Sequence, residues 1–263
     1  MKKLTSEQIK KIKNLYRKGK SLNYIANFLK LSKSTVYYYV RKTFGRKIKQ
    51  VKFNKELKEE FGEILGVFVG DGSFIFDKKY YGYIIQFTLG LNEMAYAKKL
   101  CHMIEKVFGK KCYVLIRKNY NTIIVRIKSK RIYEILREYV DWKIGKKTYT
   151  IHFKEEKVRD ERLLKGILRG LIASDGSIYV PKRKLTYSTV SKKLIKQLSS
   201  FYSQIGIENK IYKIKPRKNN EHMIYTIDLY GNEKIRKLIN FIGKINNEQK
   251  ERKIKLILDA PVI

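Results

Sequence analysis

The sequence predicts an α+β protein with two tandem αββαββα repeats related by pseudo-two-fold symmetry, preceded by a small all-α unit. Three observations support this prediction. A segment with small residues at every fourth position occurs twice and ends both times in Asp-Gly-Ser. After each copy, hairpin, helix, hairpin and helix patterns follow in the same order. The N-terminal residues instead show short amphipathic helices with their own capping residues.

The repeated segment reads as a buried helix with one glycine-rich face. Residues at four-residue spacing lie on the same side of a helix, and apolar residues fill the remaining positions. A glycine inside a helix costs roughly 1 kcal/mol relative to alanine, so its repeated use needs a structural reason. We therefore expect the two helices to pack closely against one another at the centre of the protein. The small residues are Gly62, Gly66 and Gly70 in the first copy and Gly166, Gly170 and Ser174 in the second.

Both helices are expected to end at an aspartate followed by a glycine, first at Asp71 and then at Asp175. Gly72 and Gly176 suit the left-handed conformation that ends many helices. If the helices pack side by side, the two carboxylates converge. A carboxylate at a helix C-terminus faces the unfavourable end of the helix dipole, and a second carboxylate adds repulsion. The pair therefore predicts a site for a divalent cation.

Residues 64–72 and 168–176 resemble the two motifs of single-chain LAGLIDADG homing endonucleases, and the resemblance extends from about residue 57 to the C-terminus. The chain departs from the motif at its first acidic position, which is Val69 in one copy and Ala173 in the other. That position varies in the family and does not bind the metal. The resemblance implies two antiparallel four-stranded sheets that form a DNA-binding saddle. The repeats then occupy residues 56–158 and 159–263.

The resemblance also implies a site-specific endonuclease, active in intron homing, that hydrolyses one phosphodiester in each strand of double-stranded DNA. The expected cofactor is Mg²⁺ or Mn²⁺, because this hydrolysis needs a cation on the scissile phosphate and an activated water. Asp71 and Asp175 are the expected catalytic residues and metal ligands. The backbone at Gly70 and Ser174 is expected to complete a set of hard oxygen ligands.

Members of the family also use a basic residue in the last strand of each half to organise water or offset charge. The corresponding positions are Arg126 or Lys128 in the first half, and Asp228 or Tyr230 in the second. Arg126 and Lys128 are therefore expected to be catalytic. The acidic position in the second half leaves open unequal cutting of the two strands or partial loss of activity.

Residues 1–43 predict a helix-turn-helix domain, which resembles the DNA-binding units of site-specific recombinases and repressors. Thr5 and Gln8 have the spacing of a capping box, and Ser21 and Ser32 precede the two later helices. The third helix is expected to enter a major groove. Its exposed residues are Lys33, Ser34, Thr35, Tyr37, Tyr38 and Arg41.

Residues outside this domain are also expected to contact DNA. Residues 44–55 predict a basic linker in which Arg46 and Lys47 lie along phosphates. The later strands alternate apolar and polar side chains, as expected for sheets with one face on helices and the other face open. The polar residues expected to contact DNA from the sheets and their turns are Lys78, Gln86, Arg117, Lys182, Arg183, Lys213, Lys215 and Arg217.

The composition supports a nucleic-acid partner. Lysine and arginine number 60 against 24 aspartates and glutamates, which gives a formal net charge of +36. Such an excess is typical of proteins that bind a polyanion. No apolar run of about eighteen residues appears. We therefore expect a cytoplasmic, nucleoid-associated monomer that binds double-stranded DNA and needs no membrane or protein partner. Cys101 and Cys112 are expected to be reduced thiols, because no zinc-binding spacing is present.

A catalytically inactive DNA-binding protein is the main alternative, since members of this fold also serve as transcriptional regulators and RNA-splicing maturases. The N-terminal domain would suit a regulator. The retention of both Asp71 and Asp175 favours the enzyme, because a pure binder gains nothing from two carboxylates that face phosphates. No serine or tyrosine constellation indicates a recombinase.

Overall fold

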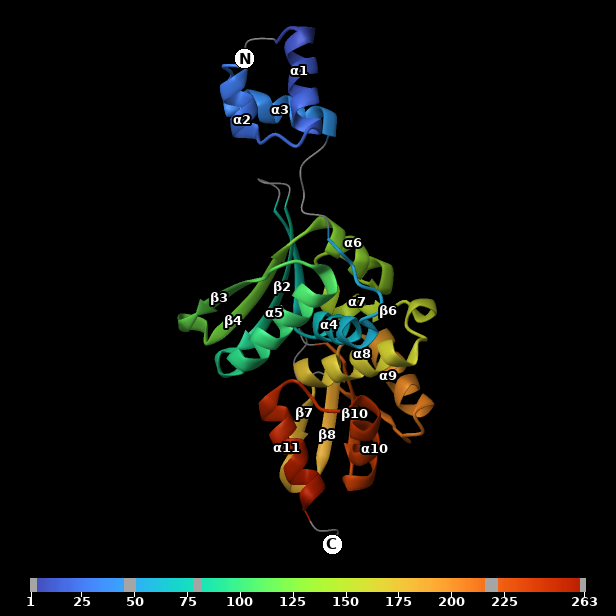
Figure 1. The fold of residues 1–263 in the computed structure, drawn as a ribbon. Helices are drawn as coiled ribbons and strands as arrows, with labels where there is room; N and C mark the ends of the chain where they lie inside the picture. The colour runs from blue at the N-terminus through green and yellow to red at the C-terminus, as the bar shows by residue number, and fades with distance from the viewer. Residues whose placement is uncertain (1–3, 45–50, 78–81, 216–221, 261–263) are drawn as a thin grey trace. The chain divides into compact units, whose positions relative to one another are not determined.

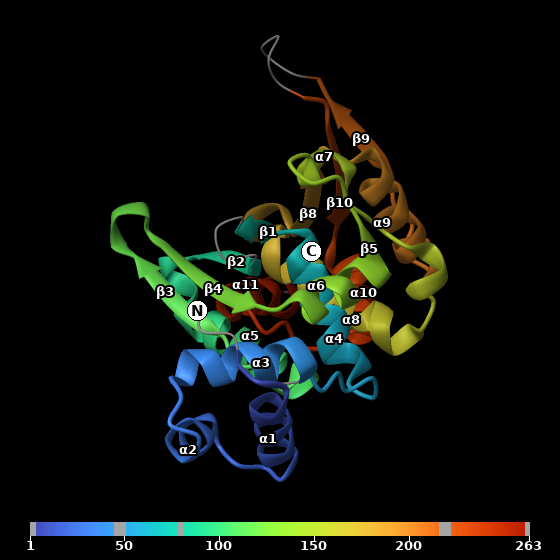
Figure 2. The ribbon, with the colours of Figure 1, turned by 90° about the horizontal axis from the view of Figure 1, so that it is seen from above.

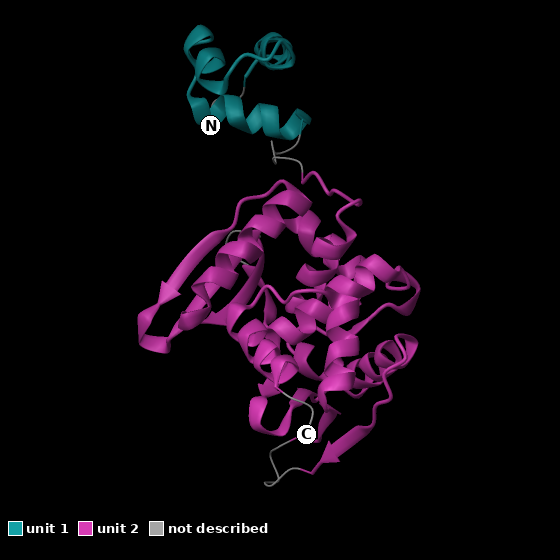
Figure 3. Ribbon diagram, turned by 60° about the horizontal axis from the view of Figure 1, so that its bottom comes forward, with its two compact units in different colours: residues 1–50 teal, residues 51–263 magenta. Residues whose placement is uncertain are grey.

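Residues 1–50 and residues 51–263 fold as two units in the computed structural model (Figure 3). The structure describes residues 4–44, 51–77, 82–215 and 222–260. Each unit has its own hydrophobic core. The predicted DNA contacts Arg46, Lys47, Lys78 and Arg217 lie outside the described residues.

The N-terminal unit is a set of three short helices around a small apolar core (Figure 1). The predicted capping box is present, because the backbone N–H of Gln8 donates to Thr5 Oγ1 at 3.2 Å and the Gln8 side chain accepts from the backbone N–H of Thr5. The hydroxyls of Ser21 and Ser32 accept backbone N–H groups at the starts of the next two helices. These contacts confirm the predicted helix starts. The helices are α1 (Ser6–Arg17), α2 (Leu22–Phe28) and α3 (Lys33–Phe44), and the core residues are Ile12, Ile25, Ala26, Val36 and Val40.

The C-terminal unit contains the two predicted αββαββα repeats. The first repeat consists of α4 (Lys58–Val69), β1 (Gly72–Asp77), β2 (Gly82–Gly90), α5 (Met94–Phe108), β3 (Tyr113–Arg117), β4 (Thr122–Lys128) and α6 (Lys130–Tyr139), with short 3-10 turns η1 (Leu91–Glu93) and η2 (Lys118–Tyr120). The second repeat consists of α8 (Glu161–Ser174), β7 (Ser177–Tyr179), β8 (Lys184–Thr189), α9 (Lys192–Gln204), β9 (Ile211–Ile214), β10 (Ile224–Tyr230) and α10 (Asn232–Ile242), with η4 (Val180–Lys182).

Two segments of this unit lie outside the repeats. The predicted terminal helix is α11 (Glu248–Asp259). The connection between the repeats contains elements that the sequence analysis did not predict. They are β5 (Val140–Asp141), α7 (Lys147–Thr150), β6 (His152–Phe153) and η3 (Glu155–Lys157), of which β5 and β6 pair as a small antiparallel ribbon.

Each repeat forms one antiparallel four-stranded sheet, with strand order β1-β2-β4-β3 in the first and β7-β8-β10-β9 in the second. Helices α5 and α6 pack on strands of the first sheet, and α9 and α10 pack on strands of the second (Figure 2). The registers match, since Gln86 lies opposite Arg126 in one sheet and Thr186 lies opposite Asp228 in the other. Equivalent positions of the two sheets can therefore be compared residue by residue.

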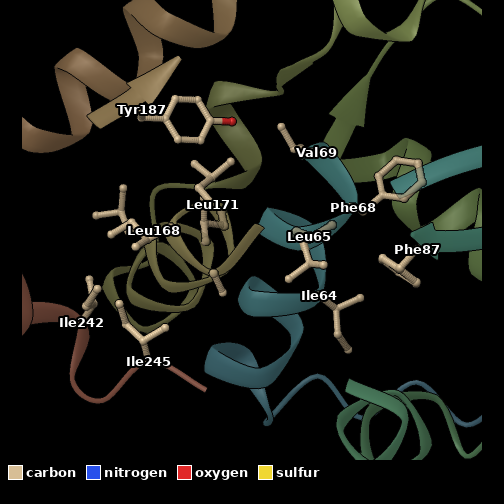
Figure 4. Close-up of a cluster of buried hydrophobic side chains, with 14 of the residues drawn as sticks. Ile64, Leu65, Phe68, Val69, Phe87, Leu168, Leu171, Tyr187, Ile242 and Ile245 are labelled. Carbon is tan, nitrogen blue, oxygen red and sulfur yellow. The ribbon is translucent and has the colours of Figure 1, made fainter. Parts of the chain in front are cut away.

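Helices α4 and α8 lie side by side at the centre of the unit, and their glycines form the contact (Figure 1). A Cβ added at Gly66 would lie 2.3 Å from the carbonyl oxygen of Ile167. A Cβ added at Gly170 would lie 2.3 Å from the carbonyl oxygen of Glu63. Side chains larger than hydrogen would therefore separate the two backbones. Their apolar residues face the surrounding core, where Figure 4 shows Leu65 of α4 and Leu168 of α8.

The predicted conformation of the glycines after the two aspartates is wrong. Neither Gly72 nor Gly176 has a positive φ. Both are instead required by close packing on the last helical turn. A Cβ at Gly72 would lie 2.4 Å from the carbonyl oxygen of Phe68, and one at Gly176 would lie 2.6 Å from the carbonyl oxygen of Ile172. Steric fit, and not backbone freedom, explains the glycine at both positions.

Cys101 and Cys112 are free thiols, half-buried against the core. Within the described ranges, no helix has the length and apolar character needed to cross a membrane.

Candidate active site between the central helices

Asp71 and Asp175 directly follow the C-terminal ends of α4 and α8, and the packing of these helices brings the two aspartates together. A Cβ added at Gly70 would lie 3.0 Å from Asp175 Oδ2. Asp71 is half-buried and Asp175 remains exposed. The glycine-rich contact thus places two carboxylates at the shared end of the helix pair.

Lys147 reaches the end of α4 from the short helix α7. Its Nζ donates hydrogen bonds to the carbonyl oxygens of Val69 at 2.7 Å and Gly70 at 3.3 Å. These carbonyls carry the negative end of the helix dipole, so an ammonium group there is electrostatically favoured.

Lys250 makes the equivalent contact at the end of α8 from the terminal helix α11. Its Nζ donates to the carbonyl oxygens of Ile172 and Ser174. The sequence analysis missed both Lys147 and Lys250. A signal was present, since each lysine follows its aspartate by nearly the same number of residues.

Burial raises the pKa of both carboxylates, and the charge of Asp175 raises that of Asp71 further. The pKa of Asp71 is raised from 3.8 to about 7, chiefly by burial and then by the charge of Asp175, while Lys250 and Lys147 oppose the rise. The pKa of Asp175 is also raised by burial, because its carboxylate lies among protein atoms although the residue is exposed at the surface. Asp71 therefore titrates near neutral pH.

The two lysines are shifted in the opposite direction. Burial lowers the pKa of Lys147 from 10.5 to about 8, and it lowers the pKa of Lys250 as well. Among the cations, Lys250 acts most strongly on Asp71, and Lys147 acts most strongly on Asp175. Each lysine is therefore hydrogen-bonded to one central helix and acts on both aspartates, most strongly on the aspartate of the other helix.

The two repeats differ in the hydrogen-bond donors beside their aspartates. The hydroxyl of Tyr187 donates to Asp175 Oδ2 at 3.5 Å and lowers the pKa of that carboxyl. The strand registers place Phe87 at the equivalent position of the first sheet, where no hydroxyl exists (Figure 4). Asp71 consequently lacks this donor.

Buried polar contacts fix the segment that carries Lys250. Glu63 of α4 is fully buried, and Asn246 Nδ2 donates to its two carboxylate oxygens at 3.0 and 2.8 Å. The next residue, Asn247, donates to the carbonyl oxygen of Ala173 at 3.2 Å and caps α11. Because a buried polar group without a partner is costly, these contacts hold the start of α11 against both central helices.

The oxygen donors of the site fit a hard divalent cation. They are the carboxylates of Asp71 and Asp175, since the predicted carbonyl ligands at Gly70 and Ser174 already accept hydrogen bonds from Lys147 and Lys250. Within the part of the chain that the structure describes, no cluster of three or more His, Cys, Asp or Glu residues could hold a metal by itself. Mg²⁺ commonly binds through one or two carboxylates and takes its other ligands from water and substrate phosphates. The donor set is therefore typical of an ion that binds together with a nucleic acid.

The predicted catalytic residues Arg126 and Lys128 are placed differently. Arg126 Nη2 donates to Gln86 Oε1 at 3.2 Å across the first sheet, and Lys128 is exposed two residues further along β4. The cations that act most strongly on the two aspartates come from α7 and α11 instead. At the equivalent second-sheet position, Asp228 accepts a hydrogen bond from Thr186 at 2.6 Å.

The predicted DNA contacts of the N-terminal unit lie on the surface of α3. Lys33, Ser34, Tyr37, Tyr38 and Arg41 are exposed. Thr35 is half-buried, and its hydroxyl lies 2.8 Å from that of Ser32.

The predicted contacts on the sheets differ in their placement. Arg117, Lys182 and Lys215 are exposed, whereas Gln86 and Arg183 are half-buried. Lys213 is exposed as well. Its partner across the strands is Tyr225, which alternates with Thr226 and Asp228, so Lys213 lies on the opposite face of the sheet from Asp228.

Comparisons with known families agree with this architecture. Residues 62–162 match a family described as the WhiA LAGLIDADG-like domain, and residues 162–243 match a LAGLIDADG-like domain. Residues 1–43 match a helix-turn-helix domain. The chain thus carries tandem LAGLIDADG-like domains preceded by a helix-turn-helix domain.

Individual relatives are more distant or much longer. The replication factor C small subunit of Methanocaldococcus jannaschii is 30% identical over 79% of this chain, which covers 10% of that protein. The chain spans 10% to 14% of the length of the curated relatives it matches. A variant of I-DmoI in complex with its target DNA in the presence of Mg is 15% identical, with a TM-score of 0.56 over 72% of this chain and 98% of that one. Full-length DUF199/WhiA from Thermatoga maritima is 16% identical, with a TM-score of 0.53 over 80% of this chain and 63% of that one. At these identities the structural similarities concern the fold alone.

Proposed function

We propose that this protein is a site-specific endonuclease that hydrolyses one phosphodiester in each strand of double-stranded DNA with Mg²⁺ or Mn²⁺. The observation that carries the proposal is the duplicated group of two aspartates and two lysines at the shared end of α4 and α8. Each repeat contributes one aspartate and each is followed by one lysine at nearly the same interval. A reaction carried out twice, once per strand, accounts for this duplication.

The titration behaviour of the group supports catalysis over simple binding. Two carboxylates that repel each other in a partly desolvated site raise the free energy of the folded protein, and their charge also repels phosphates. Strongly shifted pKa values with specific charged partners are typical of functional sites. Here the pKa of Asp71 reaches about 7 and that of Lys147 falls to about 8. The pKa values of both groups are thus shifted towards neutral pH.

The carbonyl groups at Gly70 and Ser174 already accept hydrogen bonds from Lys147 and Lys250. The cation would therefore be held by the carboxylate oxygens of Asp71 and Asp175, and it would supply charge neutralisation at the phosphate and a more acidic bound water. The protein's own contribution is to keep these oxygens converged through the contact between α4 and α8. That contact leaves little freedom, because the backbones touch at Gly66 and Gly170. A rigid site lowers the cost of arranging the charges during reaction.

We propose that the two lysines offset negative charge and donate protons during the reaction. The ammonium of each lysine can offset the negative charge that develops on the phosphate, and its Nζ can hold a proton for the leaving oxygen. The coupling pattern pairs Asp71 with Lys250 and Asp175 with Lys147. Each strand would thus be cut by the aspartate of one repeat and by the lysine that follows the other aspartate along the chain. This assignment replaces Arg126 and Lys128 as the catalytic cations and leaves them on the sheet.

The remaining basic residues are assigned to DNA binding. The two sheets and the exposed face of α3 would contact one long duplex site. Each sheet would contact one half of that site, so a single chain would bind it as a monomer. A DNA target also implies that the protein acts at the nucleoid. Because phosphate contacts release counterions, log affinity should fall against log salt with a slope of roughly −0.9 per neutralised phosphate.

A catalytically inactive DNA-binding regulator is the second candidate. One observation favours it: the ammonium groups of Lys147 and Lys250 already bond to the ends of both helices. Two carboxylates and two ammonium groups have no net charge together, so they need no metal for neutralisation. Such a protein would bind its site and leave it intact.

The test is to incubate the full-length protein with a randomised duplex library, with and without Mg²⁺, and to sequence both bound and cleaved molecules. The proposal expects Mg²⁺-dependent double-strand cleavage at one enriched sequence. The double variant Asp71→Asn, Asp175→Asn should retain the enriched bound sequence and lose cleavage by at least about 100-fold. An enriched bound sequence without cleavage by the unaltered protein would favour the regulator.

A further inference from the structure

The first row of outward-facing residues after each aspartate differs between the two sheets. In both repeats this row begins with the serine two positions after the aspartate and crosses the three hydrogen-bonded strands at matching registers. The two rows are therefore related by the internal symmetry of the protein, yet one ends in a guanidinium and the other in a carboxylate. They are Ser73, Gln86 and Arg126 in the first sheet, and Ser177, Thr186 and Asp228 in the second.

The first row is rich in hydrogen-bond donors. Arg126 Nη2 donates to Gln86 Oε1 at 3.2 Å, which leaves the amide NH₂ of Gln86 as a donor. Among the described residues, Arg126 Nε is one of the few buried side-chain polar atoms without a hydrogen-bond partner. A guanidinium carries five N–H donors and no acceptor. Because Nε is buried, only the terminal N–H groups of Arg126 could be offered to a base.

The second row ends in an acceptor. Asp228 accepts hydrogen bonds from the hydroxyls of Thr186 at 2.6 Å and Tyr230 at 3.3 Å, and Lys184 Nζ lies 3.5 Å from it. Its side chain is 14% exposed. A carboxylate offers about four acceptor positions, so three donors leave room for one more. The contacts hold Asp228 at the open face of the sheet in spite of the repulsion between a carboxylate and DNA phosphates.

We propose that Arg126 and Asp228 are specificity-determining residues that read different bases at symmetry-related positions of the two half-sites. Arginine paired with a donor-rich neighbour recognises guanine through O6 and N7, and a carboxylate accepts from the N4 amino group of cytosine. A palindromic site would present the same base to both rows. The target is therefore non-palindromic at this position, with guanine facing Arg126 in one half and cytosine facing Asp228 in the other. This inference rests on the proposed binding of a specific duplex, and it does not require cleavage.

The test measures binding, so that catalysis cannot obscure it. Full-length protein carrying Asp71→Asn and Asp175→Asn is used to select bound molecules from a randomised duplex library without divalent metal. The same selection is repeated after adding Asp228→Asn or Arg126→Gln. Asp228→Asn should reduce the preference for cytosine at one position of one half-site by about tenfold, and Arg126→Gln should do the same for guanine at the symmetry-related position. All other positions should keep their preferences.

A matched control removes one carboxylate away from the sheets. Glu134→Gln on α6 alters a residue with a 42% exposed side chain that pairs with Lys130 and Arg131, and it should leave every base preference unchanged. Melting by circular dichroism shows that each variant is folded.

A sequence preference that survives both sheet substitutions overturns this inference alone, because Asp228 would then only pair with Lys184 and would not read a base. No sequence preference in the parent protein overturns the inference together with the proposed function. A shift confined to one position supports the inference whether or not the unaltered protein cleaves DNA, so the inference can stand if the proposed nuclease activity fails.

Discussion

The two repeats are alike where α4 and α8 end and unlike across their sheets. At the helix ends, Asp71 and Asp175 are accompanied by lysines that bond to carbonyl groups of the last turn, including the equivalent Gly70 and Ser174. Across the sheets, the position of Arg126 in the first repeat is occupied by Asp228 in the second. The charge at this sheet position thus changes sign between the repeats, on the surface that would meet the bases.

This contrast separates two requirements on one duplicated fold. The chemistry on two antiparallel strands is the same reaction performed twice, so the reacting groups are kept in pairs. A long DNA site need not be symmetric, so each sheet can diverge to read its own half. The exception at the helix ends is small: Tyr187 donates to Asp175, whereas Phe87 cannot donate to Asp71.

The largest expected effect comes from substitutions in the glycine contact between α4 and α8, which brings the two helix ends together. Gly66→Ala and Gly170→Ala should each destabilise residues 51–263 by at least about 3 kcal/mol, because each new Cβ would meet a backbone carbonyl at 2.3 Å. Neither helix can move away without opening the core. Thermal melting followed by circular dichroism measures the loss.

Gly82→Ala is the matched control, because its Cβ would only touch Asp77 Cβ at 3.5 Å. It should change the melting temperature little. If Gly66→Ala and Gly170→Ala melted like this control, the close contact between the helices would be refuted.

The second prediction concerns the crossed pairing of lysines and aspartates. Lys250→Met should slow cleavage of the strand that depends on Asp71, and Lys147→Met should slow cleavage of the other strand, each by about 100- to 1000-fold. The reason is that each lysine is coupled most strongly to the aspartate of the opposite helix. Rates of nicking measured separately on the two labelled strands test this assignment.

Lys255→Met, on the exposed side of α11, is the control and should leave both rates unchanged. Equal slowing of both strands by either active-site lysine would show that the lysines act on the site as a whole.

The smallest expected effect is a pH-dependent difference in stability between the two aspartates. The folded-state pKa of Asp71 is raised to about 7, so its protonated form stabilises the fold below pH 4 and this contribution is lost as the pH rises through 7. Asp71→Asn should therefore raise the melting temperature by about 2 to 4 °C at pH 8 and change it little at pH 4. Asp175→Asn should gain less, because Tyr187 lowers the pKa of Asp175.

Tyr187→Phe copies the first repeat and should bring the two pH profiles closer together. Melting curves from pH 4 to pH 8 give the comparison. Identical profiles for Asp71→Asn and Asp175→Asn in the otherwise unaltered protein would contradict the role assigned to the Tyr187 hydroxyl.

The helices and the two aspartates could be predicted from the sequence because their signals are periodic. Glycines at four-residue spacing have one simple explanation, and the repeated Asp-Gly-Ser marks equivalent helix ends. The capping residues of the N-terminal helices are similarly local. These features depend on neighbours within one or two turns of the chain.

The lysines of the site could not be predicted in the same way. Lys147 lies on a four-residue helix in the connection between repeats, and Lys250 lies among several lysines of α11. Neither is marked by periodicity, and only tertiary packing brings them to the helix ends. For the same reason, alternation along β4 placed Arg126 on the open face but did not reveal its bond to Gln86. The glycines after the aspartates were misinterpreted because a short-range steric contact and a left-handed turn both require glycine.

The most direct measurement is strand-resolved cleavage of the selected duplex by the unaltered protein, Asp71→Asn and Asp175→Asn in Mg²⁺. If the duplicated acidic group cuts DNA, the unaltered protein cleaves both labelled strands, and each substitution abolishes the nick in a different strand. The account would be contradicted if the unaltered protein bound this duplex tightly and left both strands intact at every Mg²⁺ and Mn²⁺ concentration.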